Sequence, residues 1–265
     1  MPLMEARQAI LAASSSGDIP ALEALLHEAS IGINHPRTIY ELDSSLSESQ
    51  QLPTVVQIFE AAITGRQVNV ISFLSTKFPN TSLSGPPTRA AIDSGNAEVL
   101  KVVCQCDLAA ADSELGDDES INALGYAASK KNGAELVRVL LDAGADPNKE
   151  PPFKLPACRN VSAAVLGSLP ASTFEQFFDA GYQGNDPYAI KFAVEKQRQD
   201  ILEVLFARSR NAPDAQYPPK GELVELAEKN NDSDMIAAIK RLYAARSEGK
   251  KGLISSFVSR FRLKG

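Results

Sequence analysis

The sequence predicts an all-α protein, a helical solenoid of about six to seven stacked helix-turn-helix repeats that ends in an amphipathic tail. Three observations predict this fold class. Blocks that combine a pair of small residues with a following aliphatic stripe recur along the chain. After the first interval the blocks are about 29–37 residues apart, which is the range of helical repeats. Within the blocks, the apolar residues have the spacing of an amphipathic helix.

Residues 122–148, NALGYAASKKNGAELVRVLLDAGADPN, show the repeat unit most clearly. The pair Ala127-Ala128 predicts a first helix, and a polar turn with Gly133 follows it. A second helix is predicted by apolar residues that form one stripe, Leu136, Val137, Leu140 and Leu141. Gly144 follows this stripe, at a place where helices commonly end in a left-handed cap.

The same unit recurs in six further blocks, 12–26, 61–74, 89–103, 163–181, 192–206 and 226–239. The small residues of the seven blocks lie near positions 13, 62, 91, 128, 164, 193 and 227. Small side chains are expected there because two short helices approach closely only where the contact residues are small, and alanine keeps a high helix propensity. One hairpin cannot cover its own apolar stripes, so neighbouring hairpins must stack and share a core.

The strongest block resembles the ankyrin-repeat family. Residues 122–128, Asn-Ala-Leu-Gly-Tyr-Ala-Ala, are similar to the family's Thr-Pro-Leu-His-x-Ala-Ala. Residues 135–148, ELVRVLLDAGADPN, are similar to its Glu-Ile-Val-x-Leu-Leu-Leu-x-x-Gly-Ala-Asp-x-Asn. The resemblance extends over residues 5–245 and is strongest at 122–148. It implies an ankyrin-like array with a concave face and loop tips that bind another protein.

The same block departs from the family at two points. Gly125 stands where the family has His, and neither Thr nor Pro precedes Leu124. We therefore expect the side-chain hydrogen bonds that tie turn to helix in this family to be absent here. Looser stacking than in consensus repeats is expected as a consequence.

The chain divides into an ankyrin-like repeat domain, residues 1–247, and a basic C-terminal tail, residues 248–265. A polar insertion at 31–53 interrupts the array, and its composition predicts partial disorder. A second interruption, at 107–120, is an acidic loop that can attract a basic partner. The formal charge of −6 divides unevenly, because the tail carries five basic residues and one acid, or +4, which leaves −10 for the rest.

The tail, KKGLISSFVSRFRLKG at 250–265, combines Lys and Arg with apolar residues at helical spacing. These apolar residues are Leu253, Ile254, Phe257, Val258 and Phe261. Three roles fit this pattern. The tail can cover the exposed stripe of the last repeat, bind a partner or a second copy, or contact an anionic membrane. The first role is favoured, and membrane contact is not.

Composition and charge favour an intracellular protein, cytoplasmic or nuclear. The first residues lack the pattern of a secretory signal, and no run of about 18 apolar residues suggests a membrane span. Three cysteines are too few for a disulfide framework. The acidic body gives no support for nucleic-acid binding.

No catalytic, cofactor-binding or metal-ligating residues are predicted. Cys104, Cys106 and Cys158 with His35 do not have the spacing of a zinc site, and Cys104 falls on a buried stripe. The acidic loop 107–120 lacks the ligand alternation of a calcium loop. Neither histidine stands in a nucleophile-and-base pattern, and no phosphate-binding glycine loop is present.

The predicted function is therefore a non-enzymatic protein–protein interaction module or adaptor for an unknown protein partner. The residues expected to contact that partner lie in loops and on first helices: Tyr126, Lys130, Lys131, Lys149, Glu150, Phe153, Tyr182, Asn185 and Tyr188. Two alternatives stay open. The chain can be a regulatory or targeting subunit that associates with an enzyme or a membrane through residues 250–265, or an enzyme with an unrecognised site between repeats.

Overall fold

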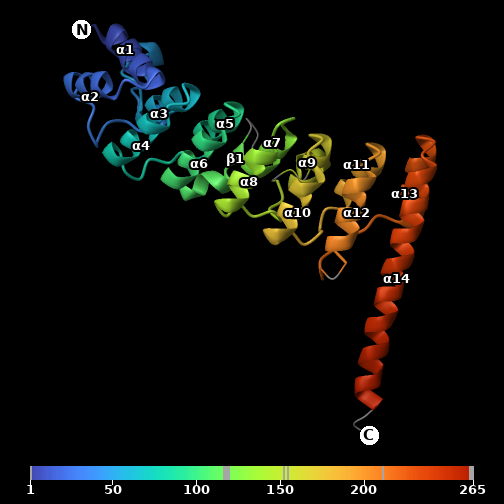
Figure 1. The fold of residues 1–265 in the computed structure, drawn as a ribbon. Coiled ribbons are helices and arrows are strands. Elements are labelled where there is room, and N and C mark those ends of the chain that lie inside the picture. Colours follow the sequence, from blue (N-terminus) through green and yellow to red (C-terminus); the bar gives the residue numbers. More distant parts are fainter. Residues whose placement is uncertain (1, 116–119, 152, 154, 211, 263–265) are drawn as a thin grey trace.

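A computed structural model describes residues 2–115, 120–151, 153, 155–210 and 212–262, with side chains as far as Ser247. Within these residues, fourteen α-helices form seven consecutive hairpins, one for each predicted block (Figure 1). The hairpins are α1 (Leu3–Ser16) with α2 (Ile19–Glu28), α3 (Val55–Thr64) with α4 (Val68–Lys77), α5 (Pro86–Asp93) with α6 (Ala97–Cys106), α7 (Ala123–Ser129) with α8 (Ala134–Asp142), α9 (Asn160–Leu166) with α10 (Ala171–Asp179), α11 (Pro187–Glu195) with α12 (Gln199–Arg208), and α13 (Lys220–Lys229) with α14 (Ser233–Arg262).

The hairpins stack in chain order, so that the helices form two layers (Figure 1). The first helices pack on one another from α1 through α13, and the second helices pack on one another from α4 through α14. The short strands β1 (Glu114–Leu115) and β2 (Ile121–Asn122) pair antiparallel just before α7. The predicted all-α solenoid of about six to seven repeats is confirmed.

The predicted small residues occupy the interior between the two layers. Each first helix has a buried alanine at the predicted place, and the seven are Ala13, Ala62, Ala91, Ala128, Ala164, Ala193 and Ala227. They lie in a single continuous core with the aliphatic residues of the second helices. The alanines leave room for adjacent first helices to approach, and the aliphatic stripes supply the buried apolar area that holds the stack together.

Left-handed residues end many of the helices. Gly144 has a φ of 94° after the second helix α8, as the sequence predicts for a helix stop. In the turns that follow the first helices, Gly95 has a φ of 64°, and polar residues take this conformation in the late repeats, where Gln197 has a φ of 55° and Asn231 a φ of 54°. The degenerate repeats therefore keep the backbone path of the stronger ones even where the glycine is missing.

Two glycines in the hairpin turns are required by close packing. A Cβ atom on Gly167 would lie 2.3 Å from the carbonyl oxygen of Ala128, in the preceding first helix. A Cβ on Gly65 would lie 2.1 Å from the carbonyl oxygen of Ser15, at the junction of the first and second repeats. Both contacts are to backbone, so a side chain there forces neighbouring repeats apart.

Three features differ from the sequence-based expectations, and the first is the cap of α7. The side-chain oxygen of Asn122 accepts a hydrogen bond from the Gly125 N–H at 2.8 Å, and its amide donates to the Lys149 carbonyl at 3.3 Å. The prediction that such ties are absent here was wrong, because Asn122 replaces the missing Thr as the helix N-cap.

The second difference is the insertion 31–53, for which partial disorder was predicted. It contains the 3₁₀ turns η1 (Ile39–Glu41) and η2 (Glu48–Gln50) and is tied to the array. Arg7 of α1 pairs with Glu48 at 2.9 Å and donates to the Gln51 carbonyl at 3.2 Å. The expectation of disorder was wrong because these long-range contacts satisfy polar groups that composition alone leaves unpaired.

The third difference concerns the predicted boundary between 247 and 248. Helix α14 runs across it without a break, so array and tail differ in composition rather than in secondary structure. The apolar tail residues from Leu253 to Phe261 have side chains outside the described part of the chain. Asp117, Asp118 and Glu119 of the acidic loop also lie outside the described residues.

The close contact at Gly167 generates the first prediction. Gly167→Ala should lower the free energy of unfolding by about 1–3 kcal/mol, because the added methyl overpacks the contact with Ala128. Gly221→Ala is the matched control, since nothing lies within 4 Å of a Cβ built there and the site is inside α13. That change should be neutral or stabilising by up to about 1 kcal/mol. Urea unfolding measures both; equal effects at the two sites would contradict the packing argument.

Candidate functional site

The solvent side of the first helices carries a row of charged and aromatic residues in one register. Relative to the buried alanine of each repeat, the row uses the positions five before, two before and two after it. Such positions lie on the same side of a helix. At these positions of α5, α7, α11, α13 and the start of α9, the charged and aromatic residues are Arg89, Asp93, Tyr126, Lys130, Arg159, Tyr188, Lys191, Glu195, Glu222, Glu225 and Lys229. We call this surface the first-helix face.

The first cluster on this face joins α5 to α7. Asp93 accepts hydrogen bonds from the Tyr126 hydroxyl at 2.8 Å and from the Lys130 ammonium at 2.7 Å. The Lys130 nitrogen lies 4.0 Å from the centre of the Tyr126 ring, and the Arg89 guanidinium lies 5.3 Å from it. The Tyr126 ring is thus held between two cations and anchored at its hydroxyl.

Charge in this cluster is balanced around Asp93. Partial burial raises the pKa of Asp93, but the hydrogen bonds from Lys130 and Tyr126 and the charges of Lys130 and Arg89 outweigh that effect and hold the pKa below its ordinary value. Partial burial lowers the pKa of Lys130, and the bonds and charges of Asp93 and Tyr126 raise it overall. Both groups are therefore ionised at neutral pH. Their exposure makes the pair worth little in stability, so its main effect is to fix the Tyr126 side chain.

The second cluster joins the start of α9 to α11 and α13. Arg159, which precedes α9, forms an ion pair with Glu150 at 2.9 Å. Its guanidinium lies 5.7 Å from the centre of the Tyr188 ring, and the Lys191 nitrogen lies 5.5 Å from the same ring on the α11 side. Lys191 in turn pairs with Glu222 of α13. As in the first cluster, two cations lie near a tyrosine ring, here at the longer distances of 5.5 and 5.7 Å.

A less polar stretch separates the two clusters. Residues Val161 to Val165 of α9 are all buried, so this helix offers little polar surface between its neighbours. The loop before α9 instead exposes Phe153, at 61%, and Leu155, at 49%. The face therefore carries two tyrosines, and in the sequence an exposed apolar loop lies between them.

The other predicted partner residues have different surroundings. Lys131 is exposed in the turn between α7 and α8, and Asn185 is half-buried before α11. Lys149 donates to the Asp112 carbonyl at 2.8 Å and lies 3.5 Å from Glu114, so it ties its loop to the preceding insertion. Partner contact by these three residues stays a prediction.

The surroundings of Tyr182 differ from the prediction. Its side chain is only 5% exposed, and its ring packs 5.1 Å from that of Phe178. Its hydroxyl accepts a hydrogen bond from the N–H of Asp186, whose carboxylate accepts from Ser162 of the preceding repeat. Tyr182 is therefore part of the junction between two repeats, and the expectation that a partner contacts it was wrong.

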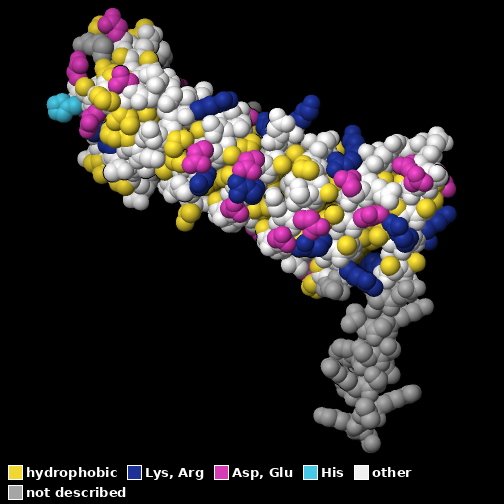
Figure 2. Space-filling view, in the orientation of Figure 1, with side chains coloured by type: hydrophobic (Ala, Val, Ile, Leu, Met, Phe, Trp, Pro, Cys, Tyr) yellow, Lys and Arg dark blue, Asp and Glu magenta, His cyan; other side chains and the backbone are white. Residues whose placement is uncertain are grey.

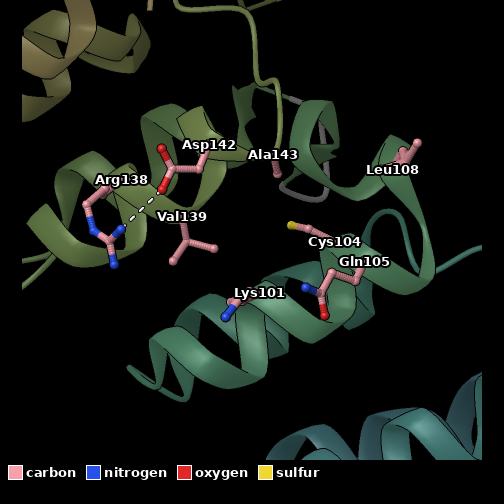
Figure 3. A pocket seen from close by; sticks show the side chains of 8 residues that line it. All are labelled: Lys101, Cys104, Gln105, Leu108, Arg138, Val139, Asp142 and Ala143. Carbon is pink, nitrogen blue, oxygen red and sulfur yellow. Dashed lines mark hydrogen bonds and ion pairs between the residues drawn. The ribbon is translucent and has the colours of Figure 1, made fainter.

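The opposite side of the array, formed by the second helices, carries intermixed acidic and basic groups (Figure 2). A pocket of about 370 Å³ lies there between α6 and α8 (Figure 3). Val139 and Cys104 line it together with the exposed Leu108, and Arg138 pairs with Asp142 at its edge at 3.1 Å. Burial, with a smaller effect of Asp107, raises the pKa of the Cys104 thiol to about 12, so this cysteine is a poor nucleophile.

Two properties of the described residues concern metal binding and membrane insertion. Among them, no group of three or more His, Cys, Asp or Glu side chains is arranged to hold a metal ion. None of the described helices combines the length and apolarity that crossing a bilayer requires.

Comparison with known protein families identifies the kind of repeat at the centre of the array. The family model "Ankyrin repeat" matches residues 121–150, which include α7, α8 and the loop after them. A search of curated proteins found no match. The segment 121–150 is thus an ankyrin repeat, as the resemblance at 122–148 indicated, and it is set in an array of similar hairpins. Ankyrin repeats are typically non-enzymatic modules for protein–protein interaction, and the match supports that general role for this chain.

The Asp93 cluster generates a prediction about pH. A depressed pKa means that Asp93 stabilises the folded state above its unfolded pKa, near 4, and that this contribution is lost as pH falls through the folded pKa. Asp93→Asn should therefore lower stability by about 0.2–1 kcal/mol at neutral pH and by less in acid. Urea unfolding at two pH values and an NMR titration of the Asp93 carboxyl measure this. A carboxyl that titrates at or above the value of a free Asp would show that the bonds to Lys130 and Tyr126 do not form.

Proposed function

We propose that this chain is a non-enzymatic adaptor that binds a protein partner across the first-helix face. The observation that carries the proposal is the pair of tyrosines, Tyr126 and Tyr188, each with two cations near its ring. Tyrosine and arginine are enriched among the residues that dominate binding energy. Side chains that are already fixed lose little conformational entropy when a partner binds.

The exposed loop before α9 completes this surface. Phe153 and Leu155 add apolar area that a partner can bury. Lys130, Arg159 and Lys191 lie beside the tyrosines in a body that is acidic as a whole. A partner segment that combines an apolar side chain with acidic residues fits these features, because it matches both the apolar loop and the local cations.

Affinity capture tests the proposal. The intact chain should retain a partner that mass spectrometry identifies, and Phe153→Ala with Tyr188→Ala should weaken that complex about tenfold or more. Leu108→Ala is the matched control, since it removes an exposed large apolar side chain from the opposite side of the array. All variants should keep the thermal midpoint of the parent chain. Capture that survives the double substitution but is lost in the control would place the binding surface elsewhere.

The tail gives the alternative function, association with an enzyme or a membrane. Its support is the sequence of residues 250–265, which joins five cations to apolar residues at helical spacing. Peripheral attachment predicts that the chain pellets with anionic vesicles and that the variant lacking 249–265 does not. Because salt screens the attraction between the five cations and the anionic surface, we expect little pelleting at physiological salt. Strong pelleting that depends on the tail would favour the membrane role over the adaptor.

A further inference from the structure

Exposed apolar side chains are concentrated at the N-terminal end of the array. Among the described residues, nine large hydrophobic side chains are exposed, and six of them lie between residues 3 and 46. They are Leu3, Met4, Ile33, Ile39, Tyr40 and Leu46. Figure 2 shows hydrophobic side chains gathered over this end of the molecule. Such a concentration is unusual for a surface that only meets water.

Part of this surface is a preformed hollow in the insertion. Ile39, Tyr40, Leu42 and Leu46 line it, together with polar residues of the same loop, and its volume is about 340 Å³. Tyr40 is 91% exposed. The Gln51 amide donates hydrogen bonds to the carbonyl groups of Asp43, at 2.9 Å, and Leu46, at 3.3 Å, which closes the loop around the hollow. We call this the N-terminal hollow.

The rim of the hollow is acidic. Residues 38–51 contain Glu41, Asp43 and Glu48 and no Lys or Arg, and of these acids Glu48 is already paired with Arg7 of α1 at 2.9 Å. Hydrogen bonds from the hydroxyl and N–H of Ser45 hold the pKa of Asp43 below its ordinary value, so this carboxylate stays ionised. The hollow therefore combines an apolar floor with an acidic rim. A basic amphipathic segment has the complementary chemistry.

The chain itself contains such a segment at its other end. Residues 250–265 carry five Lys or Arg and the apolar series that ends in Phe257, Val258 and Phe261. Helix α14 continues to Arg262, so the stretch extends the last helix of the array. Because α1 and α14 lie at opposite ends of the solenoid (Figure 1), the tail of one copy is remote from its own N-terminal hollow.

We propose that the C-terminal helix of one copy docks in the N-terminal hollow of a second copy, so that the chain self-associates head to tail. The contact is between two different surfaces, which makes the interface heterologous, and an elongated body joined in this way forms an open chain. The apolar tail residues cover Tyr40, Ile39 and Leu46, and the tail cations face Glu41 and Asp43. This interface leaves the first-helix face free, so it is independent of the proposed adaptor function.

Complementary variants of the full chain test this directly. Tyr40→Asp with Leu46→Asp disables the head, and Phe257→Asp with Phe261→Asp disables the tail. Sedimentation velocity over a wide range of concentrations should show growing assemblies for the parent chain and about tenfold or more weaker association for each variant alone. An equimolar mixture of the two variants should form a dimer that does not grow, because only one working head and one working tail remain.

Two controls separate docking from general effects. Leu108→Asp, which changes an exposed apolar residue far along the chain, should associate like the parent. Ser44→Lys adds a cation to the rim of the hollow and should weaken association, whereas Ser44→Asp adds an acid at the same place and should strengthen it. Monomers of the parent at every concentration, variants that assemble as the parent does, or a mixture that stays monomeric would each overturn the proposal.

Discussion

The close approach of the first helices at their buried alanines is the contact on which the rest of the structure depends. A hairpin of two short helices has too little interior of its own, and it becomes stable only when the next hairpin covers its apolar stripe. Ala128 and Ala164 allow that cover because both are fully buried and a small side chain lets the helices approach closely. Gly167, which lies against the carbonyl of Ala128, shows the same limit at the backbone. Stacking distance thus fixes the layers, and the layers fix which residues face water.

The fold could be predicted well from the sequence because its determinants are local and repeated. A small pair followed by an aliphatic stripe specifies one hairpin, and the period specifies the stack. The errors occurred where a single long-range contact decides the outcome. Asn122 takes over a capping role that the expected Thr would have had, and Arg7 orders an insertion 40 residues away through Glu48. Composition describes neither kind of contact.

The candidate site was only partly predictable. Tyr126, Lys130, Glu150 and Tyr188 were chosen for being polar or aromatic near a turn, and they do belong to the two clusters. Arg89, Asp93, Arg159, Lys191 and Glu222 were missed, although a signal for them was present. Counting from the buried alanine would have found all five, because each lies five before, two before or two after it. Tyr182 was misjudged because its burial depends on Phe178 and on a hydrogen bond from the N–H of Asp186, which precedes the next helix.

The fixed register of the first-helix face has a consequence for how such a protein can change. Along each first helix, the residues that face water alternate with the alanines that set the spacing between repeats. No residue belongs to both sets. Substitutions at the outward positions can therefore accumulate, exchange a tyrosine for a lysine or a glutamate, and alter specificity one repeat at a time while the scaffold stays the same. The same short helix therefore supplies residues for packing and residues for partner binding, and the two sets can change separately.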